Sequence, residues 1–210
     1  IMKAQTKEMQ AQMTPNSSLQ ELKDGNLRFT GKNPHNRNLL QQVEETSTGQ
    51  FPYATVLSCI DSRVSSELIF DQGIGDIFSV RIAGNFINED ILGSMEFACK
   101  LAGTKLVVVL GHTACGAVKG ACDHARLGNL TALINKIEPA VAAVAEPKDE
   151  ALRNSGNIDF VNEVAAKNVM MTIDNIRAKS QVLAEMEAQS EIKIIGGMYD
   201  IKTGGVTFYE

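Results

Sequence analysis

Two short runs of apolar residues dominate the hydrophobic pattern of this chain, and each predicts a buried β-strand. Leu106–Leu110 is apolar at every position and rich in valine, and Tyr53–Leu57 is predominantly apolar. An apolar run of this length, bounded by glycine or polar residues, is typical of a strand buried on both faces of a parallel sheet. Further strands are predicted at Asp76–Ile82, at Ile192–Met198 and, after a glycine pair, at the edge strand Val206–Tyr209.

Helical periodicity fills most of the sequence between these runs. One helix is predicted from Ser18 to about Gly31, because Ser18 and Glu21 have the spacing of a capping box. Another is predicted from Asn88 to Gly103. Further helical segments are expected at 38–45, 65–70, 129–145, 158–179 and 180–189, with an arm or frayed helix at 1–16. The alternation of strand and helix indicates one α/β domain over 1–210, with a helical arm at 1–50 and the core at 51–210.

Candidate chemistry follows both apolar runs at the points where the strands end. One strand leads into Cys59-Ile60-Asp61-Ser62-Arg63, and the other leads into Gly111-His112-Thr113-Ala114-Cys115-Gly116. In open α/β sheets, ligands bind outside the carboxyl ends of the strands. Two thiolates and an imidazole suit Zn²⁺, and three protein ligands leave a fourth position for water, as in catalytic zinc sites. The predicted metal ligands are Cys59, His112 and Cys115.

The neighbouring charged residues leave two roles open for Asp61. Asp61 either takes the fourth ligand position or accepts a hydrogen bond from a bound water, and Arg63 is spaced to pair with it and keep it ionised. Against the metal hypothesis, a single buried cysteine is often only a small hydrophobic side chain. Cys99 fits that description on its helix, whereas Cys122 and His124 form a weaker rival pair without strand-end geometry.

The motifs around these residues resemble those of the β-class carbonic anhydrases. Cys59–Val64 is similar to the family's Cys-Ser-Asp-Ser-Arg-Val, with isoleucine at the second position. Arg81–Asn85 resembles its Arg-Asn-x-Ala-Asn, and Gly111–Gly116 fits its Gly-His-x-x-Cys-Gly. The likeness extends from about Leu19 to the carboxyl terminus. It implies a mostly parallel central sheet flanked by helices, with strand order 2-1-3-4, a C-terminal antiparallel edge strand and an N-terminal helical arm.

The resemblance also implies a reaction and the residues that perform it. The reaction is the reversible hydration of CO₂ to bicarbonate by a zinc-bound hydroxide, the activity of a carbonate dehydratase, with one Zn²⁺ per chain on the three predicted ligands. Asp61 and Arg63 become the catalytic dyad. Val56 stands where the bicarbonate-inhibited subtype has a tryptophan, so we expect the plant-like type I subtype with an always-open site. The substrate-binding residues implied by the family are Gln50, Phe78, Ala83 and Phe97.

Two other functions are compatible with the same residues. Hydrolases of carbonyl sulfide or carbon disulfide resemble this family and use the same zinc centre. A non-catalytic structural-zinc module is the second alternative, with zinc bound by four ligands and no turnover. An ionised, salt-bridged acid is not needed at a structural site, so the pairing of Asp61 with Arg63 disfavours the module.

Composition narrows the expected partners and location. The net charge of -5 over 210 residues argues against a nucleic-acid or anionic-membrane partner. No run approaches the roughly 18 apolar residues of a membrane helix. Four cysteines are too few for a disulfide scaffold, and the first residues lack the apolar segment of a secretory signal, so we expect a cytoplasmic protein. The family resemblance adds CO₂ and bicarbonate as small-molecule partners and a homodimer or dimer of dimers, with pocket residues crossing the interface.

Overall fold

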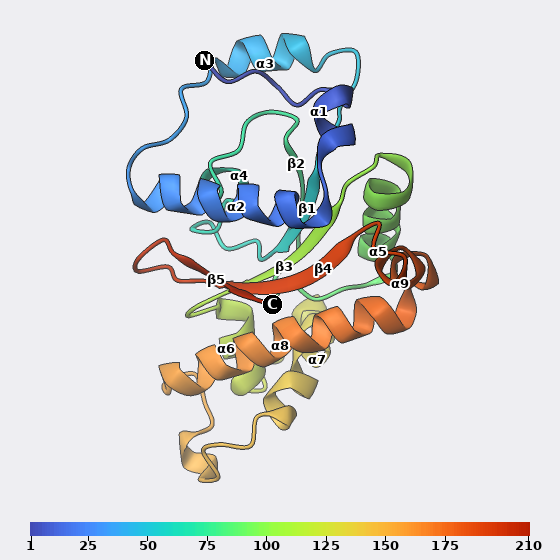
Figure 1. Ribbon diagram of the computed structural model, residues 1–210. Coiled ribbons are helices and arrows are strands. Elements are labelled where there is room, and N and C mark those ends of the chain that lie inside the picture. Colours follow the sequence, from blue (N-terminus) through green and yellow to red (C-terminus); the bar gives the residue numbers. More distant parts are fainter.

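The computed structural model describes all 210 residues and is built around a five-stranded sheet (Figure 1). The strand order is β2-β1-β3-β4-β5, with β5 antiparallel to β4 and every other neighbouring pair parallel. The predicted α/β class, strand order and antiparallel edge strand are therefore confirmed. The strands are β1 (Ala54–Ser58), β2 (Ile77–Arg81), β3 (Leu106–His112), β4 (Lys193–Tyr199) and β5 (Val206–Tyr209).

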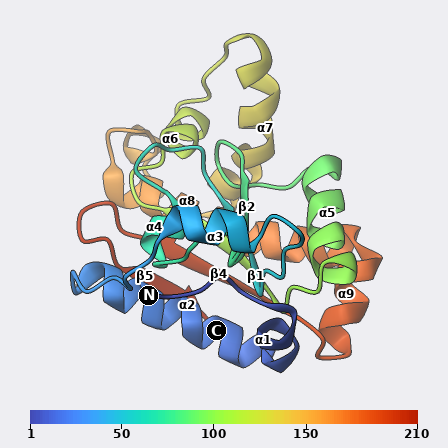
Figure 2. The ribbon, with the colours of Figure 1, turned by 90° about the horizontal axis from the view of Figure 1, so that it is seen from above.

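Helices cover both faces of the sheet. Figure 1 shows α2 on one side and α8 on the other, and both views place α5 and α9 side by side at one end (Figure 2). None of the helices has the length and apolar character needed to cross a membrane. The helices are α1 (Lys7–Gln12), α2 (Pro15–Thr30), α3 (Leu39–Glu45), α4 (Ser66–Ile69), α5 (Glu89–Glu96), α6 (Gly116–Cys122), α7 (Gly128–Ala143), α8 (Ile158–Lys179) and α9 (Gln181–Ala188), with a π-helical turn at Phe97–Leu101 and a 3₁₀ turn at Glu150–Leu152.

Strand β3 separates two hydrophobic cores. Successive side chains of a strand point to opposite faces of a sheet, so a strand that is apolar throughout supplies both faces. Leu106, Val108 and Leu110 pack into the core on the α2 side, whereas Val107 and Val109 pack into the core on the α8 side. All seven residues of β3 are buried, which explains why no polar alternation appears in its sequence.

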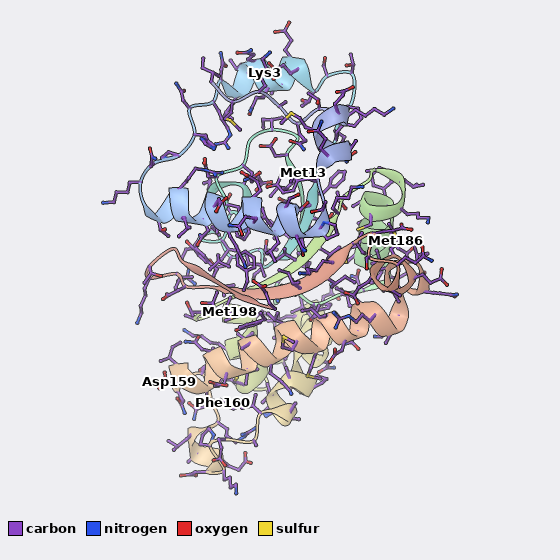
Figure 3. The ribbon with its side chains drawn as sticks, in the orientation of Figure 1. Lys3, Met13, Asp159, Phe160, Met186 and Met198 are labelled. Atoms are coloured by element: carbon purple, nitrogen blue, oxygen red, sulfur yellow. The ribbon has the colours of Figure 1, made fainter.

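A third hydrophobic cluster lies beyond the carboxyl ends of the strands. It joins buried residues of α6, α7 and α8, and it includes Cys59 and Cys115. Met198 of β4 contacts both this cluster and the core on the α8 side, and Figure 3 shows it between the sheet and α8. The two cysteines are thus set in an apolar environment, where charge–charge interactions are stronger than in water.

Helix α2 begins earlier than the sequence pattern predicts. The hydroxyl of Thr14 accepts a hydrogen bond from the Ser17 backbone N–H at 3.1 Å, the Ser17 hydroxyl accepts one from the Thr14 N–H at 2.9 Å, and Pro15 occupies the first turn. The predicted cap at Ser18 is wrong, because Ser18 lies buried inside the helix. Serine at the third helical position replaces the usual Glu or Gln of a capping box, so the true cap lacks the expected pattern.

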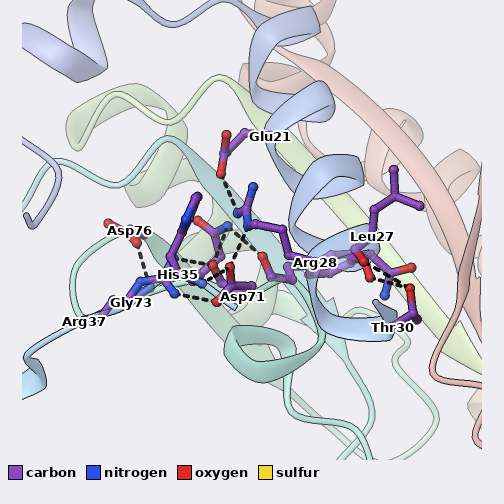
Figure 4. A network of polar contacts seen from close by, with 12 residues as sticks. Glu21, Leu27, Arg28, Thr30, His35, Arg37, Asp71, Gly73 and Asp76 are labelled. Carbon is purple, nitrogen blue, oxygen red and sulfur yellow. Dashed lines mark hydrogen bonds and ion pairs between the residues drawn. The ribbon is translucent and has the colours of Figure 1, made fainter. Parts of the chain in front are cut away.

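A buried group of charges connects α2 to the segment that precedes β2 (Figure 4). The Asp71 carboxylate accepts hydrogen bonds from Nε of Arg28 at 2.6 Å, from the backbone N–H of His35 at 3.1 Å and from the guanidinium of Arg37. Arg28 also contacts Glu21 at 2.9 Å. Only 5% of the Asp71 side chain is exposed. Asp71 is therefore the shared counter-ion of two arginines in a weakly solvated position.

Replacing Asp71 with asparagine is expected to lower the free energy of unfolding by about 3 kcal/mol, because two largely buried guanidinium groups lose their counter-ion. Burial raises the pKa of Asp71, but the hydrogen bonds from Arg28, His35 and Arg37 together hold it below its usual value. The stabilisation is consequently present above the unfolded-state pKa of about 3.9 and is lost as the pH falls through the lower folded-state pKa. Urea unfolding of wild type and variant at pH 7, and then at successively lower pH, measures both effects.

The matched control for this experiment is Asp174→Asn. The Asp174 side chain is 77% exposed and lies 3.9 Å from Arg177, so its replacement is expected to change the free energy of unfolding by about 0.5 kcal/mol or less. Equal losses in the two variants, or a wild-type advantage over Asp71→Asn that persists unchanged in acid, would contradict the assignment.

Candidate metal centre

The register of β1 and β3 brings the two predicted ligand segments together. Ser58 pairs with Leu110, so Cys59 follows β1 at the level where β3 continues to His112, its last residue. Cys115 is the N-cap of α6, three residues beyond His112. The chain turns between them at Ala114, which has a φ of 52° and donates its N–H to the Asn162 side chain at 2.9 Å. Adjacent parallel strands and one tight turn therefore deliver all three side chains to one place.

The three donor atoms form a compact buried group. The Sγ atoms of Cys59 and Cys115 are 4.0 Å apart, and the ligand atoms of both cysteines and His112 all lie within 4.8 Å of one another. Two thiolates on a tetrahedral zinc, each at about 2.3 Å, would be about 3.8 Å apart. The geometry of the sulfur pair therefore fits such an ion.

The protonation of His112 fits a metal as well. Its Nδ1 lies 2.9 Å from the carbonyl oxygen of Thr113, which accepts a hydrogen bond only if the proton is on Nδ1. Nε2 is then left with a lone pair, and it is buried without a hydrogen-bond partner. An unpaired buried acceptor costs free energy, and a cation beside two thiolates removes that cost. The donor set of one imidazole and two thiols suits Zn²⁺.

The hydrogen bond between the two thiols shifts their pKa values in opposite directions. The hydrogen bond with Cys115 is the main reason that the pKa of Cys59 lies well below its usual value. The same hydrogen bond, burial and the charge on Cys59 raise the pKa of Cys115. Cys59 is therefore the more readily ionised of the two thiols, and a divalent cation would favour the thiolate form of both.

Asp61 lies beside this group and is held by Arg63. Nε of Arg63 donates to Oδ1 at 2.9 Å, Nη2 donates to Oδ2 at 2.7 Å, and the backbone N–H of Arg63 donates to Oδ1 at 2.9 Å. These hydrogen bonds hold the pKa of Asp61 well below its usual range, although burial opposes them. Oδ2 is 3.9 Å from Nε2 of His112. An ionised acceptor thus lies beside the imidazole of the donor group.

Further residues that the sequence analysis did not single out support the cysteine segment. Arg81 donates from Nε to the Cys59 carbonyl at 2.9 Å and from Nη2 to the Asp61 carbonyl at 2.7 Å. Gly84 donates its N–H to Sγ of Cys59 at 3.4 Å, with a φ of 78° that favours glycine. Arg81 and Gly84 lie inside a family-like motif, which is the signal that could have assigned them a role, whereas no pattern in the sequence distinguishes Asn162.

The four predicted substrate-binding residues are dispersed in the single chain. The rings of Phe78 and Phe97 meet edge to face, with centroids 6.1 Å apart, and both line an open recess beside β2. Cys59, His112 and Cys115 do not line that recess. Gln50 is exposed and Ala83 is half-buried. One chain therefore places the apolar wall and the metal group in different surroundings.

The remaining cysteine and histidine candidates lie apart from this centre. Cys99 is buried in the core and accepts a hydrogen bond from Thr104, which confirms its predicted place on the helix stripe. Cys122 is buried too, but His124 is on the surface and contacts Glu138 at 3.1 Å. The rival pair therefore forms no joint donor set.

Comparison with known proteins identifies relatives over nearly the whole chain. A family model described as carbonic anhydrase matches residues 54–206. Carbonic anhydrase 2 of Mycobacterium tuberculosis is 33% identical over 196 residues, which cover 90% of each protein. A carbonic anhydrase of Mycolicibacterium smegmatis is 33% identical over 198 residues, which cover 91% of this chain and 92% of the relative.

Solved structures show the same fold. One of two tetrameric β-carbonic anhydrases from the ascomycete Sordaria macrospora superposes with a TM-score of 0.68 and 22% identity, covering 79% of this chain and 84% of that chain. The Coccomyxa β-carbonic anhydrase in complex with acetazolamide also gives a TM-score of 0.68, with 23% identity over 79% of this chain and 75% of that chain. The arrangement of sheet and helices described above is therefore a known one.

Proposed function

This chain belongs to the β-class carbonic anhydrases and catalyses the hydration of CO₂ to bicarbonate, and we propose that Cys59, His112 and Cys115 are its zinc ligands. The observation that carries the proposal is the buried, unpartnered Nε2 of His112, which faces two thiols whose sulfurs are 4.0 Å apart. One ion per chain would satisfy all three donors, and a fourth position remains for a small ligand.

Asp61, Arg63 and Arg81 have different roles in the proposed reaction. Zinc, when bound, acidifies a water and so supplies the nucleophile near neutral pH. Asp61 accepts a hydrogen bond from that nucleophile and directs its lone pair towards the carbon of CO₂. Because Arg63 holds the pKa of Asp61 so low, Asp61 orients the nucleophile and does not take up its proton at neutral pH. Arg81 donates hydrogen bonds to the carbonyls of Cys59 and Asp61 and so holds the backbone of this segment in place.

We assign the chain to the plant-like type I subtype. Val56 is fully buried in β1 at the position where the bicarbonate-inhibited subtype has a tryptophan. The pairing of Asp61 with Arg63 leaves the fourth position open, which supports a site that is always accessible. We therefore expect that Asp61 does not block the fourth ligand position of the metal.

We further propose that a second copy of the chain completes the substrate pocket. Strand β2 is an edge of the sheet, and Phe97, which packs against Phe78 of that strand, is 49% exposed. Leu101, at the end of the π-helical turn that Phe97 begins, is 77% exposed. A homodimer formed here, or a dimer of such dimers, would cover these side chains and bring the Phe78 and Phe97 wall, Ala83 and Gln50 around a metal centre. The tetrameric state of the Sordaria macrospora protein is compatible with this assembly.

Replacing Gln50 with alanine is expected to lower kcat/KM for CO₂ hydration by about threefold to tenfold, the effect of losing one hydrogen bond to a substrate oxygen. Zinc content is expected to stay unchanged, because Gln50 is not in the donor set. Gln189→Ala, at the exposed end of α9, is the matched control and should leave kcat/KM unchanged. Stopped-flow hydration assays measure both, and equal activities for Gln50→Ala and wild type would contradict the assignment.

The proposed centre is tested by measuring zinc per chain and CO₂ hydration before chelation, after chelation and after zinc is restored. We expect activity to fall and return with the metal. Full activity in the metal-depleted protein would overturn the proposal. Rapid hydrolysis of carbonyl sulfide, with little turnover of CO₂ by the zinc-loaded protein, would instead assign the centre to the sulfur-analogue reaction.

A further inference from the structure

A second cavity with a distinct chemical character lies between α7 and α8, and none of the three donor residues described above lines it. Its volume is about 330 Å³. The apolar part of its wall includes Phe86 and Ile87, which follow β2. Its polar lining consists of Asn135 and Lys136 from α7 and Asn168, Thr172, Asn175 and Lys179 from α8.

The polar residues on α8 form a continuous stripe that faces α7. Asn168, Thr172, Asn175 and Lys179 recur at intervals of three or four residues, which places them on one side of the helix. Asn168 and Thr172 are at least 96% buried, with exposures of 4% and 2%. Asn175 and Lys179, further along the stripe, are exposed, so only Asn168 and Thr172 lie where an unpaired polar group is costly.

The polar side chains of the cavity differ in burial, and among the buried ones Thr172 is the one without a partner within the protein. Asn168 donates to the carbonyl of Gly84 at 2.8 Å, but the side chains of Asn135, Thr172 and Asn175 form no hydrogen bond with any other residue. Thr172 is therefore a nearly buried hydroxyl that is directed at the cavity and unpaired. A bound molecule with several hydrogen-bonding atoms would satisfy Thr172 and could also contact the exposed amides of Asn135 and Asn175.

The charge of the cavity indicates which kind of molecule this is. Lys136 and Lys179, both exposed, line it without forming an ion pair, and the lining contains no carboxylate. The chain as a whole has a net charge of -5, so a cavity with two unpaired ammonium groups is a local reversal of sign. Ammonium, amide and hydroxyl groups all donate hydrogen bonds to oxyanions. We propose that this cavity binds a small, multiply charged oxyanion of the phosphate type.

The backbone of Gly84 connects this cavity to the donor group through two hydrogen bonds. Asn168 binds the carbonyl of Gly84, and the N–H of Gly84 binds Sγ of Cys59. An anion that engages Asn168 therefore acts on the segment that orients Cys59. The proposal rests on the cavity itself and does not depend on the function assigned to Cys59.

Inorganic phosphate is the probe that tests the site. Calorimetric titration of the full-length wild-type protein, at constant ionic strength set with chloride, is expected to show saturable binding. In the double variant Lys136→Gln with Lys179→Gln, the dissociation constant is expected to rise by about tenfold or more, since two charge-assisted contacts are removed. Thr172→Val keeps the size of the side chain and is expected to weaken binding less, by about threefold to tenfold.

The matched control is Lys167→Gln, which removes an exposed lysine from another face of α8 and should leave phosphate binding unchanged. Amide NMR shifts then locate the anion, and they are expected at Thr172 and Asn175. Absence of saturable binding by wild type would overturn the proposal. Binding that is equal in the double variant, with shifts confined to the surroundings of His112 and Cys115, would overturn it too, because the phosphate would then occupy the donor group.

Discussion

The Cys59→Ser variant is expected to lose bound zinc and CO₂ hydration together, with activity reduced by about a thousandfold or more. A serine hydroxyl is not ionised near neutral pH and is a much poorer zinc ligand than a thiolate, so the remaining His112 and Cys115 would hold the ion weakly. The measurement is zinc per chain by atomic absorption, taken on the same sample as stopped-flow hydration. Wild type should contain about one zinc ion per chain.

The control for this experiment is Cys99→Ser, which also replaces a buried thiol. Cys99 accepts a hydrogen bond from Thr104 in the core and belongs to no donor group, so zinc content and activity should be retained in the folded variant. Far-ultraviolet circular dichroism establishes that both variants are folded. A Cys59→Ser protein that keeps a full complement of zinc would show that the ligand assignment is wrong.

The Asp61→Asn variant is expected to keep its zinc and to lose about 100-fold to 1000-fold in kcat. Asparagine preserves the shape of the side chain but removes the negative charge that Arg63 holds through two side-chain hydrogen bonds. The nucleophile would then lose its acceptor, and an amide N–H could face it instead. The expected defect is therefore in orientation, with the donor group intact.

The pH dependence separates this role from that of a general base. Hydrogen bonds from Arg63 hold the pKa of Asp61 well below its usual range, so Asp61 stays ionised throughout pH 6 to 9, as judged against an ordinary aspartate pKa of about 3.9. Wild-type activity is expected to rise towards alkaline pH because the nucleophile titrates, and Asp61→Asn should lower the whole profile but keep its alkaline rise. Loss of the titration in the variant, or release of its zinc, would contradict this account. Asp174→Asn provides the control, since its side chain is exposed on α8.

The sheet was predictable because the uninterrupted apolar sequences of its central strands indicate burial on both faces. β3 is apolar at the positions that face both cores, and no helix pattern competes with it. The helix Ile158–Lys179 was predicted with both of its ends, because Asn157 caps it and the change to Ser180 starts the next helix. Such elements depend on local chemistry that a single sequence contains.

Other features depend on contacts that are distant in the sequence. Residues 97–101 continue the predicted helical pattern but form a π-helical turn, which no local periodicity distinguishes. The support of Ala114 by Asn162 joins residues 48 positions apart. The metal-ligand candidates were found because motifs mark them, whereas the cavity between α7 and α8 arises from the packing of two helices and has no motif.

The sequence separation of the donor residues has a consequence for the thermal stability of the protein. Cys59 and His112 are 53 positions apart in the sequence. An ion bound by both would link the two ends of that stretch and close it into a loop. The three donors come together only when β1 and β3 pair, so the ion binds the folded chain in preference to the unfolded one. Zinc would thus serve as a removable cross-link, and the melting temperature of the protein should depend on free zinc concentration through linkage of binding to folding.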